Sequence, residues 1–443
     1  MMDKIFSLIK KHPLAIILLI VSILYIIWVW LPLGLIHSWN EAYYMLRVTH
    51  IAQGGSYLDG AFDNPPLFVY FLVILSKIFG ISLILFRILI IFCTLVIIYL
   101  TYRLGEIFGN KKIAVVSSSL FAFFPMIVIF SKIIQIDIFA IMLMTASFYF
   151  AILGIKFNRK WFFLSGFFLG LCVLTKLPAG FIILPIFYYM YTKKIELKYF
   201  LFIIIEIILV QIPWVFYVLI TKPSFFKSSD SSSSNFFGLG VMHNDAPFYE
   251  LAMILLAILV FVSLLILFWK YKPISVEEKT LALFSLIFSG FFVLLPNHEY
   301  YLLPIFVPLF LFIGIIYTDK KLNRIKNLLI MFIAISIILI IIRPVYDVNW
   351  EEAVDFVKNN YPENVSIYSA SPVVTEYYIG YKVNWLNPNT IENISKNNTI
   401  IMFTCYDKIN LEELGLIKII ENDFTFLEDL EKKIFIYGSK DLT

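Results

Sequence analysis

The sequence is poor in charge and in cysteine. Only 15% of its 443 residues are charged and the net charge is +4, so it offers no concentrated basic surface for nucleic acid. Of its three cysteines, Cys93 and Cys172 lie inside apolar runs and Cys405 stands alone near the C-terminus, so neither a disulfide framework nor a CxxC metal site can be built. The chain is instead 60% hydrophobic, with a mean hydropathy of +0.87. This composition predicts an integral membrane protein.

Long apolar runs divide the chain into candidate transmembrane helices. A helix needs roughly 20 apolar residues to cross a bilayer, and by that length residues 1–343 form an all-α polytopic membrane domain with about eleven spans. The predicted spans are 14–34, 84–103, 112–130, 135–155, 161–176, 179–192, 199–220, 248–269, 280–296, 301–318 and 327–343. The apolar run 67–79 is predicted to be a partly embedded helix or an extra span.

The positive charges predict the orientation, because cytoplasmic loops retain lysine and arginine. With the N-terminus inside, nineteen lysines and arginines fall in inner loops, and seven fall in the outer segments before Arg343. A first outer loop, 35–83, a long outer loop, 221–247, and the C-terminal residues are therefore predicted to be extracytoplasmic. Counting 67–79 as a full span would destroy this asymmetry.

The composition changes near residue 344. A helical segment at 350–359 is followed by strand-like runs at 365–368, 399–404, 416–420 and 434–437. This alternation predicts a small soluble α/β domain over 344–443, on the outer face.

The first outer loop is the most polar stretch before that domain. Its residues Ser38 to Leu67 contain Glu41, Asp63 and Arg47. Glu41 has a structural interpretation, because Ser38 and Glu41 fit a capping box that begins a helix. Asp63 likewise fits an ordinary turn before a proline pair. As catalytic groups, these carboxylates would accept a proton from an acceptor hydroxyl or amine.

Further ionisable residues fall close to the predicted outer ends of spans. They would therefore lie in the same layer as the first outer loop, at the outer membrane surface. Such groups cost about 2.5 to 3.5 kcal/mol at membrane depth, so a chain keeps few of them without a function. They are Arg87, Lys132, Asp137, Lys176 and His298. Asp137 could instead cap a helix, and Lys176 could extend to the interface. An ion-coupled transporter would more typically place its charges at mid-bilayer.

Four motifs carry a family resemblance. They are Asn40-Glu41 with Tyr44 followed by 63–67 (DNPPL), Pro125 followed by Asp137, 166–178 ending in LTKLP, and 298–304 (HEYYLLP). In this order they resemble the GT-C superfamily of lipid-linked-sugar glycosyltransferases, in the branch of protein O-mannosyltransferases and the lipid A aminoarabinose transferase. The sequence departs from the branch in having Asn40 at the usual catalytic Asp position. It also has Tyr43 and Asn64 where the aminoarabinose enzymes would have Arg and Lys.

The resemblance implies a function. A sugar would pass with inversion from a polyprenyl phosphate, dolichyl or undecaprenyl, to a protein, lipid or glycan acceptor on the outer face. Membrane lipids would be partners, and nucleic acid would not. The chemistry would need no catalytic metal or other cofactor. A site outside the cell cannot use nucleotide sugars, which are confined to the cytoplasm, so its donor must arrive within the bilayer.

The resemblance and the residues together give three groups of candidates. The candidate catalytic carboxylates are Glu41, Asp63 and Asp137. The candidates for donor phosphate binding are Lys176, His298, Arg47 and Arg87. The candidates for acceptor or sugar binding are Asn40, Tyr44, Asn64, Tyr300 and Tyr301. Two other functions stay open, a transporter or flippase of lipid-linked sugars and a non-catalytic scaffold that binds the carrier.

Overall fold

The computed structural model describes a helical body followed by a small sheet. It describes residues 12–30, 39–58, 64–221, 258, 260–269, 271–294, 299–318, 350–362, 365–369, 372–380, 382–385, 399–404, 415–420 and 434–438. The helices of the body are α2 (Pro13–Trp30), α3 (Trp39–Ala52), α4 (Leu67–Phe79), α5 (Leu83–Phe108), α6 (Lys111–Phe123), α7 (Pro125–Phe130), α8 (Ile136–Lys156), α9 (Trp161–Val173), the 3-10 helix η1 (Leu177–Ile182), α10 (Ile183–Thr192), α11 (Leu197–Thr221), α14 (Val276–Leu294), the 3-10 helix η3 (Glu299–Leu302) and α15 (Leu303–Thr318). The long outer loop, the span predicted at 327–343 and half of the span predicted at 248–269 lie outside the described residues.

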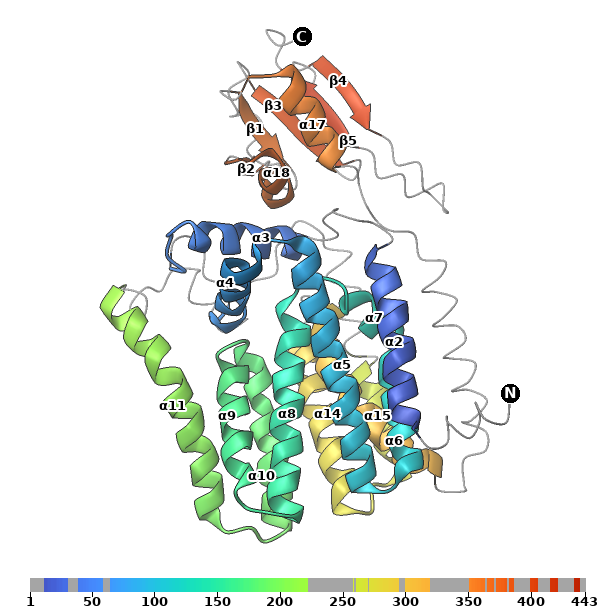
Figure 1. The fold of residues 1–443 in the computed structure, drawn as a ribbon. Helices are drawn as coiled ribbons and strands as arrows, with labels where there is room; N and C mark the ends of the chain where they lie inside the picture. The colour runs from blue at the N-terminus through green and yellow to red at the C-terminus, as the bar shows by residue number, and fades with distance from the viewer. Residues whose placement is uncertain are drawn as a thin grey trace.

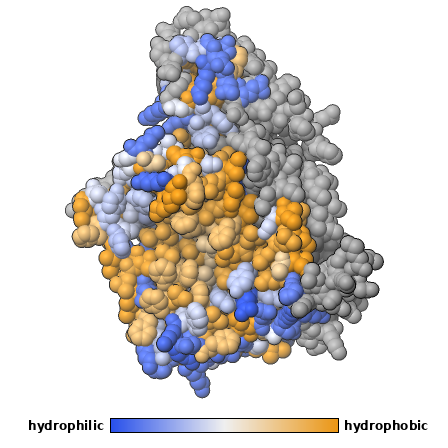
Figure 2. Space-filling view, viewed as in Figure 1, coloured by the Kyte–Doolittle hydropathy of each residue, from blue (hydrophilic) through white to orange (hydrophobic). Residues whose placement is uncertain are grey.

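The body is a bundle whose long helices run side by side (Figure 1). α3 lies across the upper end of the bundle, and α5 and α8 both begin at that end (Figure 1). Figure 2 shows a broad hydrophobic band across this face of the body, with hydrophilic residues gathered at its lower end. We call the end that carries α3 the site end and the opposite end the far end.

Among the described residues, three helices are long and apolar enough to cross a membrane, α5, α8 and α11, and several shorter apolar helices accompany them. The predicted count of about eleven spans therefore stays a prediction. α4 has 13 residues, about 20 Å of helix, which is too short to cross a hydrocarbon core of about 30 Å. Its bounds match the run predicted as a partly embedded helix.

One predicted span is broken. The sequence predicts a continuous helix over 112–130, but α6 ends at Phe123 and α7 begins with Pro125. Proline has no N–H to donate to the preceding turn and disfavours a helical residue before it, so the helix restarts with proline in its first turn. A second predicted span, 161–176, ends early at Val173, which leaves Lys176 outside the helix.

Two glycines bring α9 and α11 close together. A Cβ added to Gly166 would lie 3.0 Å from the Ile203 Cα and 2.7 Å from the Glu206 Cβ. A Cβ on Gly170 would lie 2.7 Å from the Val210 Cβ. Small residues four positions apart permit such close backbone packing between membrane helices. The contact also places Glu206 of α11 beside α9.

Replacing Gly166 by alanine is expected to destabilise the protein by roughly 1 to 3 kcal/mol, because the backbone of Ile203 has to move. Thermal unfolding in detergent would measure the change. Gly290→Ala is the matched control, since a Cβ there meets its nearest atom, Phe261 Cε2, at an ordinary 3.7 Å. Equal unfolding temperatures for the two variants would contradict the close packing.

The described residues of the C-terminal part form a five-stranded sheet with two helices. The elements are α17 (Trp350–Asn360), β1 (Ser366–Ser369), α18 (Pro372–Ile379), β2 (Asn384–Trp385), β3 (Thr399–Thr404), β4 (Gly415–Ile420) and β5 (Ile434–Gly438). The strand order is β2-β1-β3-β5-β4. The first three strands are parallel, and β5 and β4 are antiparallel to their neighbours. α18 packs against α3, so this part of the chain contacts the helical body at the site end (Figure 1).

Candidate functional site

The buried charges of the described residues define the candidate site. Six charged side chains are buried there: Glu41, Arg47, Arg87, Lys132, Asp137 and Lys176. They come from α3, the first turns of α5 and α8, the segment before α8, and the residue before η1, all at the site end. Four cations and two carboxylates leave an excess of two positive charges. Since burying charge is costly, six such groups at one end indicate a built site.

Asp137 and Lys176 form an ion pair at the centre of this group. Lys176 Nζ donates to Asp137 Oδ1 at 2.5 Å, and both side chains are almost inaccessible to solvent. The side chain of Gln135, the N-cap residue of α8, donates to Asp137 Oδ2 at 2.8 Å. Both carboxylate oxygens of Asp137 therefore receive a hydrogen bond. The pair joins two predicted site residues that are 39 positions apart in the chain.

An aromatic ring lies against the Lys176 ammonium. Its Nζ is 4.2 Å from the centroid of the Tyr301 ring, within the range of a cation–π interaction. Tyr301 belongs to η3, so the third motif and the fourth, about 120 positions further on, meet here. The structure thus places Lys176, Asp137 and Tyr301 together, one residue from each of three predicted roles.

Glu41 and Arg87 form a second ion pair. Arg87 donates through Nε to Glu41 Oε1 at 3.0 Å and through Nη2 to Glu41 Oε2 at 2.8 Å. The backbone N–H of Ile134 also donates to Glu41 Oε1, at 3.0 Å. Both side chains are fully buried, at 0% and 1% exposure. Glu41 therefore connects α3 to α5 and to the segment that leads into Asp137.

These contacts concern both roles considered for Glu41, the capping box and the catalytic carboxylate. Its carboxylate points to Arg87 and Ile134, which are distant in sequence, and the Ser38 end of the proposed capping box lies outside the described residues. The bidentate guanidinium and the Ile134 N–H together occupy both carboxylate oxygens of Glu41. The catalytic role of Glu41 and the phosphate-binding role of Arg87 stay predictions, and the contacts support a positioning role for both.

Arg47 lies among tyrosines on the other side of α3. Its guanidinium carbon is 5.6 Å from the Tyr43 ring centroid and 5.5 Å from that of Tyr57. Arg47 Nε also donates to the Tyr43 hydroxyl at 3.3 Å. Tyr44 is buried and packs edge-on against Phe68, with 5.0 Å between the ring centroids.

The loop segment from Asn64 to Leu67 connects two parts of the site. The Tyr57 hydroxyl donates to the backbone oxygen of Asn64 at 2.7 Å, and the N–H of Leu67 donates to the Leu174 oxygen at 3.1 Å. Leu174 precedes Lys176 by two residues. The first outer loop is thereby held beside the chain that carries the phosphate-binding lysine candidate.

The remaining predicted residues are placed as follows. Asn40 is half-buried in the first turn of α3. Tyr300 lies in η3, but its side chain is not among those described. Asp63 and His298 lie outside the described residues. Their roles stay predictions.

Sequence analysis missed Gln135 and Tyr57. Gln135 could have been noticed as a polar residue two positions before Asp137 at the start of an apolar run. Tyr57 had no comparable signal, because its contact with Arg47 depends on how the chain turns after α3. Within the described part of the chain, no three His, Cys, Asp or Glu side chains are grouped so as to hold a metal ion.

Comparisons with known proteins agree with the motifs. The profile of the family described as dolichyl-phosphate-mannose-protein mannosyltransferase matches residues 63–220. The fold is similar to that of ArnT from Cupriavidus metallidurans bound to undecaprenyl phosphate, with a TM-score of 0.62 at 12% identity over 96% of this chain and 98% of that one. Both the family match and the fold agree with the resemblance to the GT-C superfamily. The family match contains Arg87, Lys132, Asp137 and Lys176, four of the six buried charges.

Two further solved structures resemble this chain in fold. Apo ArnT from Cupriavidus metallidurans has a TM-score of 0.55 at 10% identity, covering 98% of this chain and 99% of that one. The apo oligosaccharyltransferase of Archaeoglobus fulgidus has a TM-score of 0.51 at 12% identity, covering 88% and 66%. No curated protein sequence matches this chain. At these identities the likeness establishes the fold, and the substrates have to be argued from the site.

Proposed function

We propose that this chain is a GT-C glycosyltransferase that moves a sugar from a polyprenyl phosphate to an acceptor at the site end of the bundle. The observation that carries the proposal is the convergence of six buried charged side chains, with an excess of two positive charges, on that end. A phosphate that leaves a sugar accumulates negative charge, and buried cations stabilise that charge more strongly than water does. The undecaprenyl phosphate bound to ArnT supports the same class of carrier.

Lys176 is the proposed phosphate ligand. Its ammonium is fixed by Asp137 and by the Tyr301 ring, so little rearrangement is needed when a phosphate arrives. Asp137 orients Lys176, and Gln135 in turn orients Asp137. Arg47 and Lys132 contribute positive charge to the same end. This arrangement is suited to a monophosphate, which one or two cations can neutralise.

The proposed reaction is a direct displacement. The acceptor oxygen or nitrogen attacks the anomeric carbon, the bond from that carbon to the phosphate oxygen breaks, and the carrier phosphate leaves with the bonding electrons. Inversion at the anomeric carbon follows from attack opposite to the leaving group. The acceptor's proton passes to a carboxylate, for which Glu41, Asp63 and Asp137 are the candidates.

The site end is proposed to face the outside of the cell. Lys156 and Lys193, both predicted to be cytoplasmic, lie at the far end, where they contact Glu277. The positive-inside rule then places the far end in the cytoplasm and the candidate site outside. A donor dissolved in the bilayer reaches such a site without crossing water.

The test is turnover by the purified protein. It would be incubated with a panel of polyprenyl-phosphate sugars and acceptors, and the products identified by mass spectrometry. We expect transfer from at least one donor, with release of the polyprenyl phosphate. Carrier binding without turnover would instead indicate a scaffold, and movement of an intact lipid-linked sugar across vesicles would indicate a flippase.

A further inference from the structure

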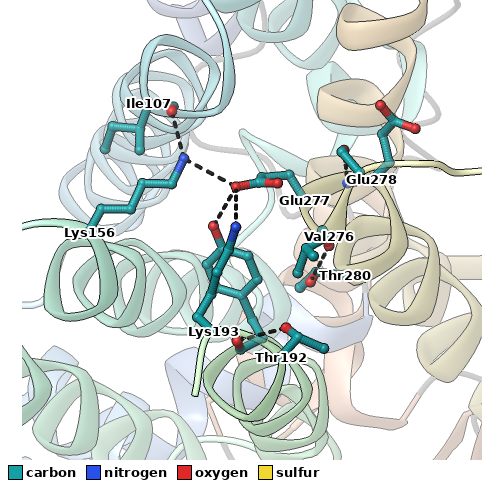
Figure 3. Close-up of polar contacts among 10 residues, drawn as sticks. Ile107, Lys156, Thr192, Lys193, Val276, Glu277, Glu278 and Thr280 are labelled. Atoms are coloured by element: carbon teal, nitrogen blue, oxygen red, sulfur yellow. Dashed lines mark hydrogen bonds and ion pairs between the residues drawn. The ribbon is translucent and has the colours of Figure 1, made fainter. Parts of the chain in front are cut away.

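A second cluster of charged residues lies at the far end of the bundle (Figure 3). Glu277, in the first turn of α14, accepts a hydrogen bond at Oε1 from the Tyr189 hydroxyl at 2.8 Å. The same oxygen lies 3.2 Å from Lys193 Nζ and 3.4 Å from Lys156 Nζ. Lys156 also donates to the backbone oxygen of Ile107 at 3.1 Å, which includes the end of α5 in the cluster.

The elements that meet at Glu277 are those that carry the site. α8 has Asp137 in its first turn and ends at Lys156. The segment that begins after Lys176 continues through η1 and α10 and ends at Tyr189 and Lys193. α14 begins at the Glu277 cluster and leads to η3, which contains Tyr301. These three elements are therefore joined by polar contacts at both ends, about 30 Å apart along α8.

The contacts in this cluster favour the ionised form of the Glu277 carboxylate. Burial raises the pKa of Glu277, but hydrogen bonds from Tyr189 and Lys193 and the charge of Lys156 lower it, and the resulting pKa is about 2. The Lys156 ammonium lies 5.5 Å from the centroid of the Phe108 ring, and that of Lys193 lies 5.4 Å from the Tyr189 ring. The two lysines are thus held by rings as well as by the carboxylate, which limits the positions they can take.

We propose that Glu277 is a positioning residue for the site at the other end of the bundle. Glu277 fixes the far ends of α8, α10 and α14 relative to one another. It thereby sets the positions along the bundle axis at which Asp137, Lys176 and Tyr301 meet. The contact between Lys176 and the Tyr301 ring depends on these axial positions, because the two residues belong to different elements. This role rests on the proposed transfer reaction.

Glu277→Gln is the test variant, because it keeps the shape of the side chain and removes its charge. We expect kcat for sugar transfer to fall by roughly tenfold to a hundredfold, with the KM for the donor unchanged, since the donor still binds but the reacting groups are misplaced. Lys193→Gln should give a smaller fall in the same direction. Glu106→Gln is the matched control, because its ion pair with Arg103 lies within α5 alone.

Backbone hydrogen exchange tests the same role independently of activity. In Glu277→Gln, we expect faster exchange at 176–179 and 299–302, at the site end, and no such change in Glu106→Gln. Faster exchange confined to the far end, or spread evenly over all helices including α9, would overturn the positioning role. If the wild-type protein transfers no sugar from any donor, the proposed function fails, and the exchange result still decides whether Glu277 controls the site end.

Discussion

Replacing Lys176 by glutamine is expected to lower kcat for sugar transfer by roughly 100- to 1000-fold, the usual effect of losing one group that stabilises developing charge. The substitution removes the ammonium that Asp137 and the Tyr301 ring hold in place. It also leaves the buried Asp137 carboxylate without this counter-ion. Asp137→Asn should give a loss of similar size, because Lys176 then loses the group that orients it. Initial rates with a saturating polyprenyl-phosphate sugar would measure both effects.

The double variant Asp137→Asn/Lys176→Gln tests whether the two residues act as one unit. Groups that act together give non-additive losses, so the double variant should be about as active as the weaker single variant. Lys198→Gln is the control, since Lys198 pairs with Glu196 in an exposed position at the start of α11. Wild-type kcat in Lys176→Gln would remove Lys176 from the mechanism. A loss in the double variant equal to the product of the single losses would mean that they act independently.

Replacing Glu41 by glutamine is expected to destabilise the protein by roughly 3 to 5 kcal/mol, the usual cost of breaking a fully buried ion pair. Arg87 would keep its charge at 1% exposure without the carboxylate that now receives two of its hydrogen bonds. Thermal unfolding in detergent would show the loss as a large fall in the unfolding temperature. An unfolding temperature equal to that of the wild type would show that the pair contributes little to stability.

The double variant Glu41→Leu/Arg87→Met separates stability from chemistry. Apolar residues of similar volume can replace a buried ion pair with little net cost, so most of the lost stability should return. If Glu41 is a positioning residue, this variant should also regain part of the transfer activity lost in Glu41→Gln. If Glu41 is the proton acceptor, the variant should fold and remain inactive. The amide variants Asp63→Asn and Asp137→Asn then identify which other carboxylate accepts the proton.

Several features of the chain could be predicted from sequence because each depends on local composition. The 13-residue apolar run at 67–79 was too short for a span, and α4 has the same bounds. The strand predicted at 399–404 coincides with β3, where residues of high strand propensity are consecutive. The break at Pro125 was missed because hydropathy continues across it while the backbone hydrogen bonding does not.

The candidate site was predictable as a set of residues but not as a set of contacts. The cost of burying charge in a membrane singled out Arg87, Asp137 and Lys176 before any fold was known. Their partners could not be derived, because Glu41 and Arg87 are 46 positions apart and Asp137 and Lys176 are 39 apart. The far-end contacts of Glu277 were not anticipated at all, since a glutamate among inner-loop lysines looks like an ordinary solvated residue.

Hydropathy and charge along the sequence predict that this protein lies in a membrane, which way its basic loops face, and which few charged residues remain at the ends of its helices. Hydropathy and charge determine, for each residue separately, whether it favours water or the bilayer. Both can therefore be assessed without knowing any contact between distant residues. The tertiary structure was needed to show that Lys176 pairs with Asp137 and lies against the Tyr301 ring, and that Arg87 pairs with Glu41. Those pairings depend on how far each helix is rotated about its axis and shifted along it. Close packing against the neighbouring helices sets both.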